Sequence, residues 1–432
     1  MIEFFIIFIY LFLAGLSIWL LSVSQLKNAS IAFGALVGCV YFLAIPFGFI
    51  LFYGEVTDSG LISDGYFPYE DLKTTFNFFL GWVVVISAFI TEQKYRIRIL
   101  NLKQKITFDA GKVFYSMIFL YFVISIYGGI STGAFTNGLH WHDSSRFEST
   151  AFLILKNFAN CYRVLIFGVL LYFFENKTFS KKRIIIIGFL FVLFDLIISF
   201  NRITILYYLI LLIFIYRNWY KPIILAVLFI FPLVINFSTA WTQFRGLASV
   251  NGYSISTFAE AWTEAYSNLD NNNKSAFVER MNAIFESSNL IVFHEVVENT
   301  GGKLDVQYGR TFLLRPLTTF IPSTIWQDKP KVYGVYLGEK INSYKGLALN
   351  STLFGEAYGN FYYFWPFMLY IALIFFGLIY KFISNSMPGI AFGGVFVGVS
   401  IWRFDINFVV ASLYSIAIIA FLLFVFKKVG FR

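Results

Sequence analysis

The sequence has little charge and few of the residues that build soluble catalytic centres. Only 13% of its 432 residues are Asp, Glu, Lys or Arg, and it contains three histidines and two cysteines. A typical globular protein has about 25% charged residues. With 58% hydrophobic residues, the chain cannot cover a soluble surface. Cys39 and Cys161 both lie in apolar stretches, which excludes a disulfide framework and favours simple packing roles.

Motifs that bind nucleotides or metals are also missing. The chain contains no GxxxxGK[ST] phosphate loop, no Rossmann glycine fingerprint, no HExxH and no CxxC. It also lacks the DxD pair that metal-dependent nucleotide-sugar transferases use. These absences argue against an ATP-driven pump and against a nucleotide-sugar enzyme, and we expect no metal or other cofactor. No basic segment precedes the first apolar run, so we expect no cleaved signal peptide.

Long apolar runs predict an all-α integral membrane protein. A bilayer core about 30 Å thick needs about 20 mainly apolar residues in each helix. We predict about eleven transmembrane helices, at 4–23, 30–53, 74–91, 113–130, 151–174, 184–200, 203–216, 222–240, 361–380, 388–402 and 404–426. The chain then divides into an N-terminal membrane region over 1–240, a large loop over 241–360 and a C-terminal membrane region over 361–432.

The connections between these spans alternate in charge, which predicts their orientation. Two connections, 54–73 and 131–150, contain two bases and seven acids. Six others contain 17 Lys and Arg against three acids. These six are 24–29, 92–112, 175–183, 217–221, 381–387 and 427–432. Because basic connections stay in the cytoplasm, we expect the N-terminus outside, the C-terminus inside and 241–360 outside. The net charge of +9 is therefore a topology signal, and we expect no nucleic-acid partner.

The outer block 241–360 is expected to be partly helical. Thr257 and Glu260 have the spacing of a capping box that opens an amphipathic helix. A second helix is predicted from Lys274 to Val297. After Tyr308, glycines and prolines interrupt apolar residues, a pattern typical of surface-lying or re-entrant elements. Long loops of this kind are usually functional, and a passive cap is the alternative.

Ionisable residues inside the predicted spans are functional candidates, because charge in lipid costs free energy. Lys156, Asn160 and Arg163 have helical spacings that place them on one face of the span 151–174. Arg163 is deep in this helix and needs an anionic partner. Asp195 in the next span would make an internal ion pair, whereas a bound ligand would make a functional site.

Other arginines are predicted near the outer ends of helices. Arg202 lies at the tip of a hairpin over 184–216, whose arms of about 15 residues are expected to stop below the outer surface. Arg403 should share a helix face with Asn407 at the junction of the last two spans. Further arginines flank the membrane in the outer block: Arg245, Arg310 and Arg315. If they converge, their forked donors match a phosphate or diphosphate.

Candidate proton acceptors on the predicted outer face are few. Glu356 enters the span 361–380 beside Tyr358 and Asn360. A carboxylate next to an aromatic ring and an amide can hold a sugar and take a hydroxyl proton. An equally simple interpretation is an acid placed near a helix N-terminus by the helix dipole.

The remaining candidates are histidines and one pair of acids. His140 and His142 are interpreted as surface residues, since two ligands alone make a weak metal site. His294 lies in a predicted helix and is interpreted as an ordinary helical residue. Glu70 and Asp71 resemble the paired acids of some lipid-linked glycosyltransferases, although any exposed loop can contain such a pair.

One part of the outer block resembles a known family. The run from Arg315 through Phe320-Ile-Pro322 and Trp326 to Lys329-Pro330 resembles the "R…FIPxxxWxxKP" element of Wzy-type O-antigen and oligosaccharide repeat-unit polymerases. The segment 346–361 resembles the part of those polymerases that leads into the next span. Motif similarity covers about 310–361, with weaker support at Arg202 and Arg403. One departure is Tyr362-Tyr363, where related sequences often have a glycine.

The resemblance implies a GT-C-type membrane glycosyltransferase in the bacterial cytoplasmic membrane. Such polymerases join undecaprenyl-diphosphate-linked oligosaccharides on the outer face. They transfer the growing glycan from its lipid diphosphate to the non-reducing end of a lipid-linked repeat unit. The expected partners are these two lipid-linked glycans and the bilayer, and a chain-length regulator would be a further partner. Neither nucleotide nor metal is implied.

The resemblance also gives roles to the candidate residues. The diphosphate would be bound by Arg163, Arg202, Arg310, Arg315 and Arg403. Glu356 is the first choice for the base that takes the acceptor proton, and His142 is the second. Trp326, Tyr358 and Asn360 would contact sugars. Three other classes remain open: an O-antigen-ligase-type transferase, a lipid-linked oligosaccharide flippase and a membrane O-acyltransferase, which would need a histidine at membrane depth.

Overall fold

The structure, a computed structural model, is all-helical over the part of the chain that it describes. The described residues are 2–53, 65–94, 108–131, 150–199, 203–216, 237, 239–241, 243–244, 247, 255–270, 287–319, 321, 325–341 and 348–429. Within these ranges there is no β-strand, and one isolated bridge joins Thr300 to Leu304. The predicted all-α class is confirmed at this level.

Seven helical segments are long and apolar enough to cross a membrane. They are Ile2–Val23, Ile31–Phe52, Leu72–Lys94, Ala110–Gly128, Leu155–Glu175, Thr352–Ser384 and Asn407–Lys427. Two shorter apolar helices are Ile203–Ile215 and Ile390–Phe404. The chain therefore has the helical character of a multi-pass membrane protein.

Ten of the eleven predicted spans coincide with helices, while 222–240 falls almost entirely outside the described residues. The helices at these spans are α1 (Ile2–Val23), α2 (Ile31–Cys39) continuing through η2 (Val40–Ala44) into α3 (Ile45–Tyr53), α4 (Leu72–Lys94), α5 (Ala110–Ser131), α7 (Thr150–Glu175), α8 (Lys181–Ser199), α9 (Ile203–Ile215), α17 (Trp365–Ser384), α18 (Ile390–Phe404) and α19 (Asn407–Val429). Pro46 explains the π-helical turn η2, because its ring removes a helical hydrogen bond and clashes with the preceding turn.

The chain divides into two compact units. The first contains 1–116, 164–172 and 285–432, and the second contains 117–163 and 173–284. The predicted outer block is therefore divided between them, since 285–360 belongs to the first unit and 241–284 to the second.

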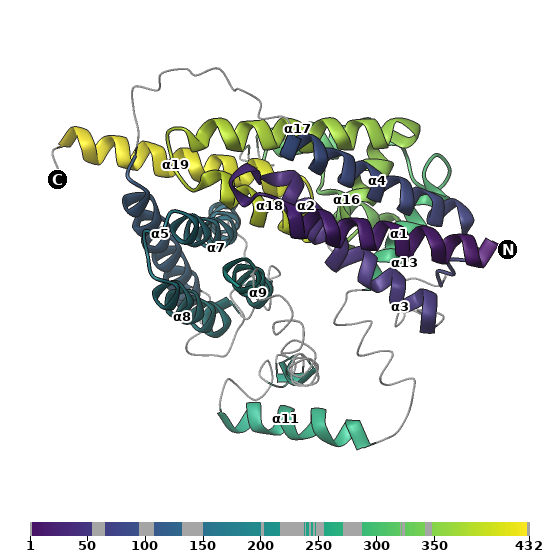
Figure 1. The fold of residues 1–432 in the computed structure, drawn as a ribbon, viewed down its shortest axis with the longest axis horizontal. Coiled ribbons are helices and arrows are strands. Elements are labelled where there is room, and N and C mark those ends of the chain that lie inside the picture. Colours follow the sequence, from purple (N-terminus) through teal and green to yellow (C-terminus); the bar gives the residue numbers. More distant parts are fainter. Residues whose placement is uncertain are drawn as a thin grey trace. The chain divides into compact units, whose positions relative to one another are not determined.

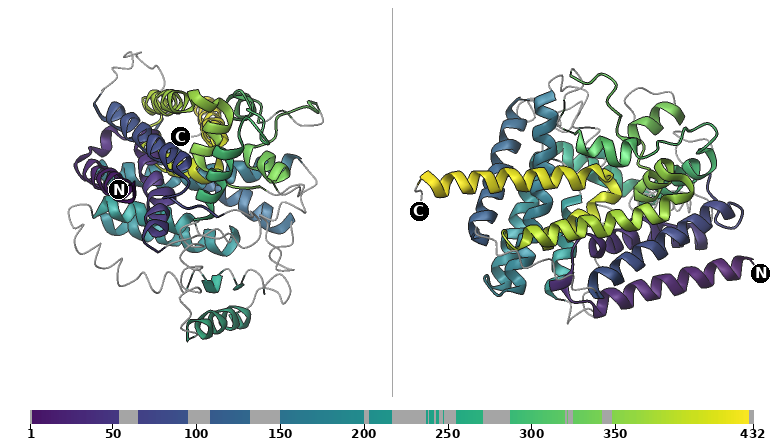
Figure 2. Two further views of the ribbon diagram at one scale, coloured as in Figure 1. Left: turned by 90° about the vertical axis from the view of Figure 1, so that its right-hand side faces the viewer. Right: turned by 90° about the horizontal axis from the view of Figure 1, so that it is seen from above.

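In the first unit, α2 and α18 approach each other at glycines. A Cβ atom on Gly34 would lie 1.7 Å from the Val395 carbonyl oxygen, and one on Gly398 would lie 2.2 Å from that of Ile31. Such backbone contact requires small residues, as is common between membrane helices. The helix α4 packs against α1, α2 and α17 (Figures 1 and 2).

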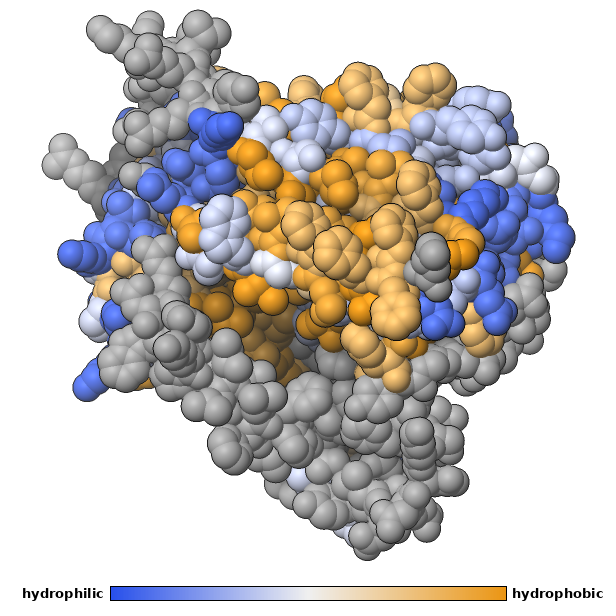
Figure 3. Space-filling view, turned by 45° about the vertical axis from the view of Figure 1, so that its right-hand side comes forward, coloured by the Kyte–Doolittle hydropathy of each residue, from blue (hydrophilic) through white to orange (hydrophobic). Residues whose placement is uncertain are grey.

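Large apolar side chains remain exposed on the outside of this unit. Phe4 and Phe8 of α1 are 80% and 68% exposed, and Phe367 of α17 is 63% exposed. Figure 3 shows apolar side chains gathered over a broad area between two hydrophilic ends. Exposed aromatics at this density suit a lipid environment and would be unfavourable in water.

The outer block contains short helices. They are α11 (Ile255–Asp270), α13 (Ser288–Asn299), the π-helical turn η5 (Arg310–Leu314), α14 (Arg315–Leu317), α15 (Tyr333–Ile341), α16 (Thr352–Phe361) and the 3₁₀ turn η6 (Tyr362–Phe364). The helix α11 begins at Ile255, so Thr257 lies inside its first turn and the predicted capping box does not open the helix. The helix predicted over 274–297 is described only from Ser288 onwards. Within the described residues of 308–360 no helix is longer than the 10 residues of α16, and α16 begins the membrane-length segment Thr352–Ser384.

Candidate functional site

The structure brings most of the candidate residues into the first unit. Arg310, Arg315, Trp326, Glu356, Tyr358, Asn360 and Arg403 all belong to it. Arg163 belongs to the second unit. Arg202, Arg245, His140 and His142 lie outside the described residues.

Arg315 starts a short helical turn, and its guanidinium group is partly buried. Gly309 has φ 79°, a left-handed conformation that glycine adopts without strain, and the chain then turns through η5 into α14. The hydroxyls of Thr318 and Thr319 close this turn by donating to the Arg315 carbonyl oxygen at 3.2 Å. The Arg315 Nε and Nη1 atoms are buried and have no hydrogen-bond partner among the described residues. Burial lowers the pKa of Arg315 from its usual value.

Lys329 lies close enough to Arg315 for the two charges to interact. Its ammonium group donates to the carbonyl oxygens of Thr319 at 2.9 Å and Ile321 at 2.6 Å. Burial and the positive charge of Arg315 lower the pKa of Lys329 to about 8. A partly buried arginine whose charge lowers the pKa of a neighbouring lysine forms a site that an anion would stabilise.

Asn360 fixes this segment on α16. Its amide oxygen accepts the backbone N–H groups of Thr311 and Phe312 at 3.2 and 3.3 Å. Its amide nitrogen donates to the Thr311 hydroxyl at 2.6 Å and to the Glu356 carbonyl oxygen at 2.8 Å. These four bonds use the full capacity of an asparagine side chain. Asn360 therefore holds the segment that leads to Arg315, and a sugar would have to displace one of these bonds.

Glu356 is fully buried and contacts the turn between α18 and α19. Its Oε2 atom accepts the Ile406 backbone N–H at 2.9 Å, and its Oε1 atom has no hydrogen-bond partner among the described residues. Asp405 in that turn has φ 61°, a strained value for a residue with a side chain. The carboxylate thus supports a tight turn. No part of its side chain is exposed to a substrate in this conformation.

The same turn contradicts one sequence expectation. Arg403 and Asn407 were expected on one helix face at i, i+4. However, α18 ends at Phe404 and α19 begins at Asn407, with the strained Asp405 between them. The expected shared face is wrong because two helices meet here.

The other predicted contacts vary in exposure. Arg310 and Arg403 are exposed, and Trp326 is half-buried. Tyr358 is 4% exposed, and its ring packs 5.6 Å from Tyr362. Tyr362 has φ 48°, so the departure from the family pattern falls on a residue whose backbone favours glycine.

Arg163 has an internal partner in the second unit. Its Nε and Nη2 atoms both lie 2.9 Å from Asp195 Oδ1, and its Nη1 donates to Asn160 Oδ1 at 2.7 Å. Tyr121 and Thr204 also donate to the Asp195 carboxylate. The Arg163 and Asp195 side chains are 1% and 0% exposed. The ion pair that the sequence left as one of two alternatives is present.

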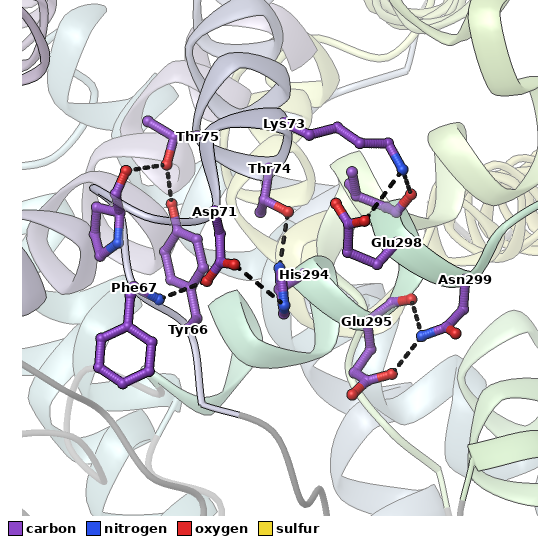
Figure 4. Close-up of polar contacts among 12 residues, drawn as sticks. Tyr66, Phe67, Asp71, Lys73, Thr74, Thr75, His294, Glu295, Glu298 and Asn299 are labelled. Carbon is purple, nitrogen blue, oxygen red and sulfur yellow. Dashed lines mark hydrogen bonds and ion pairs between the residues drawn. The ribbon is translucent and has the colours of Figure 1, made fainter. Parts of the chain in front are cut away.

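A second polar cluster, which the sequence did not single out, joins α4 and α13 (Figure 4). His294 Nδ1 lies 2.9 Å from the Thr74 hydroxyl, and His294 Nε2 lies 4.0 Å from Asp71 Oδ1. The other carboxylate oxygen of Asp71 accepts the Phe67 backbone N–H at 2.8 Å. The acid at Asp71 was noted from the sequence, but 220 residues separate Thr74 from His294 and no local pattern links them.

Comparisons with known proteins identify no relative. No protein-family model, curated protein or solved structure matches this chain.

Proposed function

We propose that the protein is a membrane glycosyltransferase that polymerises lipid-diphosphate-linked oligosaccharide repeat units, as the Wzy-type resemblance implies. The observation that carries this proposal is the pair of neighbouring cations Arg315 and Lys329. Two buried guanidinium atoms of Arg315 have no hydrogen-bond partner among the described residues, and its charge lowers the pKa of Lys329. Both residues belong to the run that resembles the polymerase element.

The chemistry of the reaction explains why such a pair is needed. The acceptor hydroxyl oxygen attacks the anomeric carbon, and the bond between that carbon and the diphosphate oxygen breaks. The diphosphate leaves with the electron pair, so its negative charge grows in the transition state. Fixed cations in a partly desolvated site stabilise that charge, because they are already in place and need not rearrange as the charge forms. Two substrates anchored in one bilayer also gain from proximity.

Contacts on the predicted outer side support the proposed orientation. The connection 54–73 and the outer block, which are both predicted to lie outside, meet where Asp71 approaches His294. The outer block also meets the last inter-helix turn where Glu356 binds the Ile406 N–H at 2.9 Å.

Contacts on the predicted cytoplasmic side support the same orientation. Phe108 N–H donates to Ser386 O at 2.8 Å, and Lys381 donates to Glu92 O at 3.1 Å. The start of α1 and the end of α19 lie at opposite ends of the first unit (Figures 1 and 2). This grouping is expected of a chain with its N-terminus outside and its C-terminus in the cytoplasm.

The proposal uses only some of the candidate residues. Arg315 and Lys329 bind the diphosphate, with Arg310 and Arg403 as exposed cations that contribute to its approach. Trp326, which is half-buried, remains the sugar contact of this proposal, whereas Tyr358 is buried and is left out. Arg163 is left out because Asp195 already neutralises it.

Reconstitution with a defined substrate tests the proposed function. The purified full-length protein in lipid nanodiscs is incubated with a synthetic undecaprenyl-diphosphate-linked repeat unit. We expect a ladder of products that grow by whole repeat units. Movement of the lipid-linked sugar across a vesicle membrane without elongation would instead indicate a flippase. Transfer of preformed chains to another acceptor without elongation would indicate a ligase.

The pKa of Lys329 predicts how substrate binding depends on pH. With a pKa of about 8, Lys329 is protonated below that pH and loses its charge above it. A diphosphate diester does not titrate in this range, so its affinity should fall as the pH rises above about 8, by at most about tenfold per pH unit. Binding is measured between about pH 6 and 10 with a fluorescent lipid diphosphate.

Two variants control this measurement. Lys329→Met should remove the pH dependence. Lys331→Met should keep it, because Lys331 is 58% exposed and paired with Glu339. A pH dependence that persists unchanged in Lys329→Met would show that another group controls binding.

A further inference from the structure

The cluster that joins α4 and α13 has the geometry of a proton-accepting site. The 4.0 Å between His294 Nε2 and Asp71 Oδ1 is too long for a direct hydrogen bond. An oxygen atom about 2.8 Å from each of them fits into this gap. A sugar hydroxyl in this gap can donate its one proton to Nε2, and a neighbouring hydroxyl of the same sugar can donate to the Asp71 carboxylate.

Both side chains are held by contacts that leave these two atoms facing each other. Thr74 binds the opposite nitrogen of His294, and the Phe67 N–H binds the opposite oxygen of Asp71 (Figure 4). The Tyr66 ring packs 5.6 Å from the His294 ring, and the Tyr66 hydroxyl is fixed by Thr75 at 2.7 Å. A group held at its far side by a hydrogen bond is oriented for reaction at its near side.

The position of the cluster suits a reaction at the membrane boundary. Asp71 directly precedes the membrane-length helix Leu72–Lys94, and α13 is not among the membrane-length helices. The Asp71 side chain is 25% exposed and that of His294 is 11% exposed. A substrate group can approach the exposed edge of Asp71, in contrast to Glu356, which is entirely buried. The helix α16 packs against both α13 and η5, and so connects this cluster to the Arg315 segment.

We propose that His294 is the general base of the glycosyl transfer and that Asp71 orients the acceptor and stabilises the imidazolium. This inference rests on the proposed function. The His294 Nδ1 proton is donated to the Thr74 hydroxyl, which leaves the lone pair of Nε2 facing the acceptor. As the acceptor oxygen bonds to the anomeric carbon, its proton moves to Nε2 and the lipid diphosphate leaves with the bonding electrons. The new imidazolium then lies beside the Asp71 carboxylate, which stabilises its charge.

Steady-state kinetics of the full-length protein in nanodiscs test this role. His294→Gln should lower kcat for elongation by about 10²-fold or more, the usual contribution of a general base. KM for the acceptor and the binding of a fluorescent lipid diphosphate should change less than about threefold, because His294 is proposed to act in the transition state and not to bind the diphosphate. Asp71→Asn should also lower kcat, by about tenfold or more.

Glu298→Gln is the matched control. Glu298 lies one turn after His294 on α13, its side chain is 42% exposed, and it pairs with Lys73 at the surface. This variant should elongate at the wild-type rate. Thr74→Val tests the orientation of the imidazole and should lower kcat while leaving lipid-diphosphate binding intact.

The possible outcomes separate this inference from the proposed function. If the wild-type protein elongates and His294→Gln keeps the wild-type kcat, the inference is wrong and the proposed function stands. If His294→Gln does not fold, the variants Asp71→Asn and Thr74→Val test the inference instead. A wild-type kcat in both of these variants would overturn it. If the wild-type protein binds the substrate but forms no product, both the proposed function and this inference are wrong.

Discussion

Replacing Asp195 with leucine while Arg163 remains is expected to lower the free energy of unfolding by about 3–5 kcal/mol. The reason is that Arg163, the partner that remains, is buried. The Arg163 side chain is 1% exposed and makes both of its ionic contacts to Asp195 Oδ1 at 2.9 Å. Removing the carboxylate leaves a guanidinium charge without compensation in a low-dielectric interior.

Two further groups lose a hydrogen bond to Asp195 in the same variant. The hydroxyls of Tyr121 and Thr204 both donate to Asp195, and all three side chains are buried. A hydrogen bond to a charged group contributes about 1.5–3 kcal/mol, so the loss of these bonds adds to the cost. The effect of Asp195→Leu should therefore be at the upper end of the range for single substitutions.

The measurement is reversible unfolding of the purified protein in mixed detergent micelles. The double variant Arg163→Met/Asp195→Leu should recover much of the loss, because an apolar pair replaces the whole ion pair. Asp305→Asn is the control, since Asp305 is 74% exposed and its contact with Lys340 is 3.6 Å long. Exposed pairs of this kind contribute about 0–1 kcal/mol. Equal stabilities of Asp195→Leu and the wild type would refute the structural role of this pair.

The helices could be predicted from the sequence because each depends on a local apolar run. Membrane-length runs are recognised without knowledge of their neighbours. The observed helix ends differ from the predicted ones where the local backbone conformation stops a helix. The sequence predicted a junction between the spans 388–402 and 404–426, but the strained backbone at Asp405, with φ 61°, places the break between Phe404 and Asn407. The expected shared face of Arg403 and Asn407 failed for this reason.

The candidate site could be predicted only in part, because its contacts join distant segments. Arg163 needed a partner in either interpretation, and the structure supplies Asp195 from 32 residues away. The pairing of His294 with Asp71 could not be predicted in this way. In the sequence His294 stands among the apolar residues of 290–297, so it is interpreted as a packing residue, and all of these residues are buried. Only the structure, in which α4 packs beside α13, shows that Thr74 and Asp71 are polar neighbours of His294.

Replacing Arg315 with methionine is expected to abolish elongation and, at the same time, to stabilise the ligand-free protein. The rate should fall by about 10²–10³-fold, the range found when one group that stabilises a developing oxyanion is removed. Arg315→Lys keeps a charge but loses the forked donors, so an intermediate rate is expected. The diphosphate-binding role predicts this order of rates: wild type, then lysine, then methionine.

The expected gain in stability follows from the unsatisfied guanidinium atoms. The Nε and Nη1 atoms of Arg315 are buried and have no hydrogen-bond partner among the described residues, and the neighbouring Lys329 repels the charge. Methionine removes a partly buried charge that nothing in the described chain compensates, so the thermal unfolding midpoint should rise. The pKa of Lys329 should also rise towards its usual value, because a positive neighbour is gone. Functional sites commonly retain such unfavourable groups because the ligand stabilises them.

Opposite signs of the two effects make this prediction specific. A residue that holds the fold together would lose activity and stability together, whereas a binding residue that is unsatisfied without its ligand loses activity and gains stability. Lys331→Met, in the same segment but paired with Glu339 at the surface, should change neither quantity measurably. Unfolding midpoints and ladder assays on the same preparations distinguish these cases. A lower midpoint for Arg315→Met, or a normal ladder from it, would remove Arg315 from the diphosphate site.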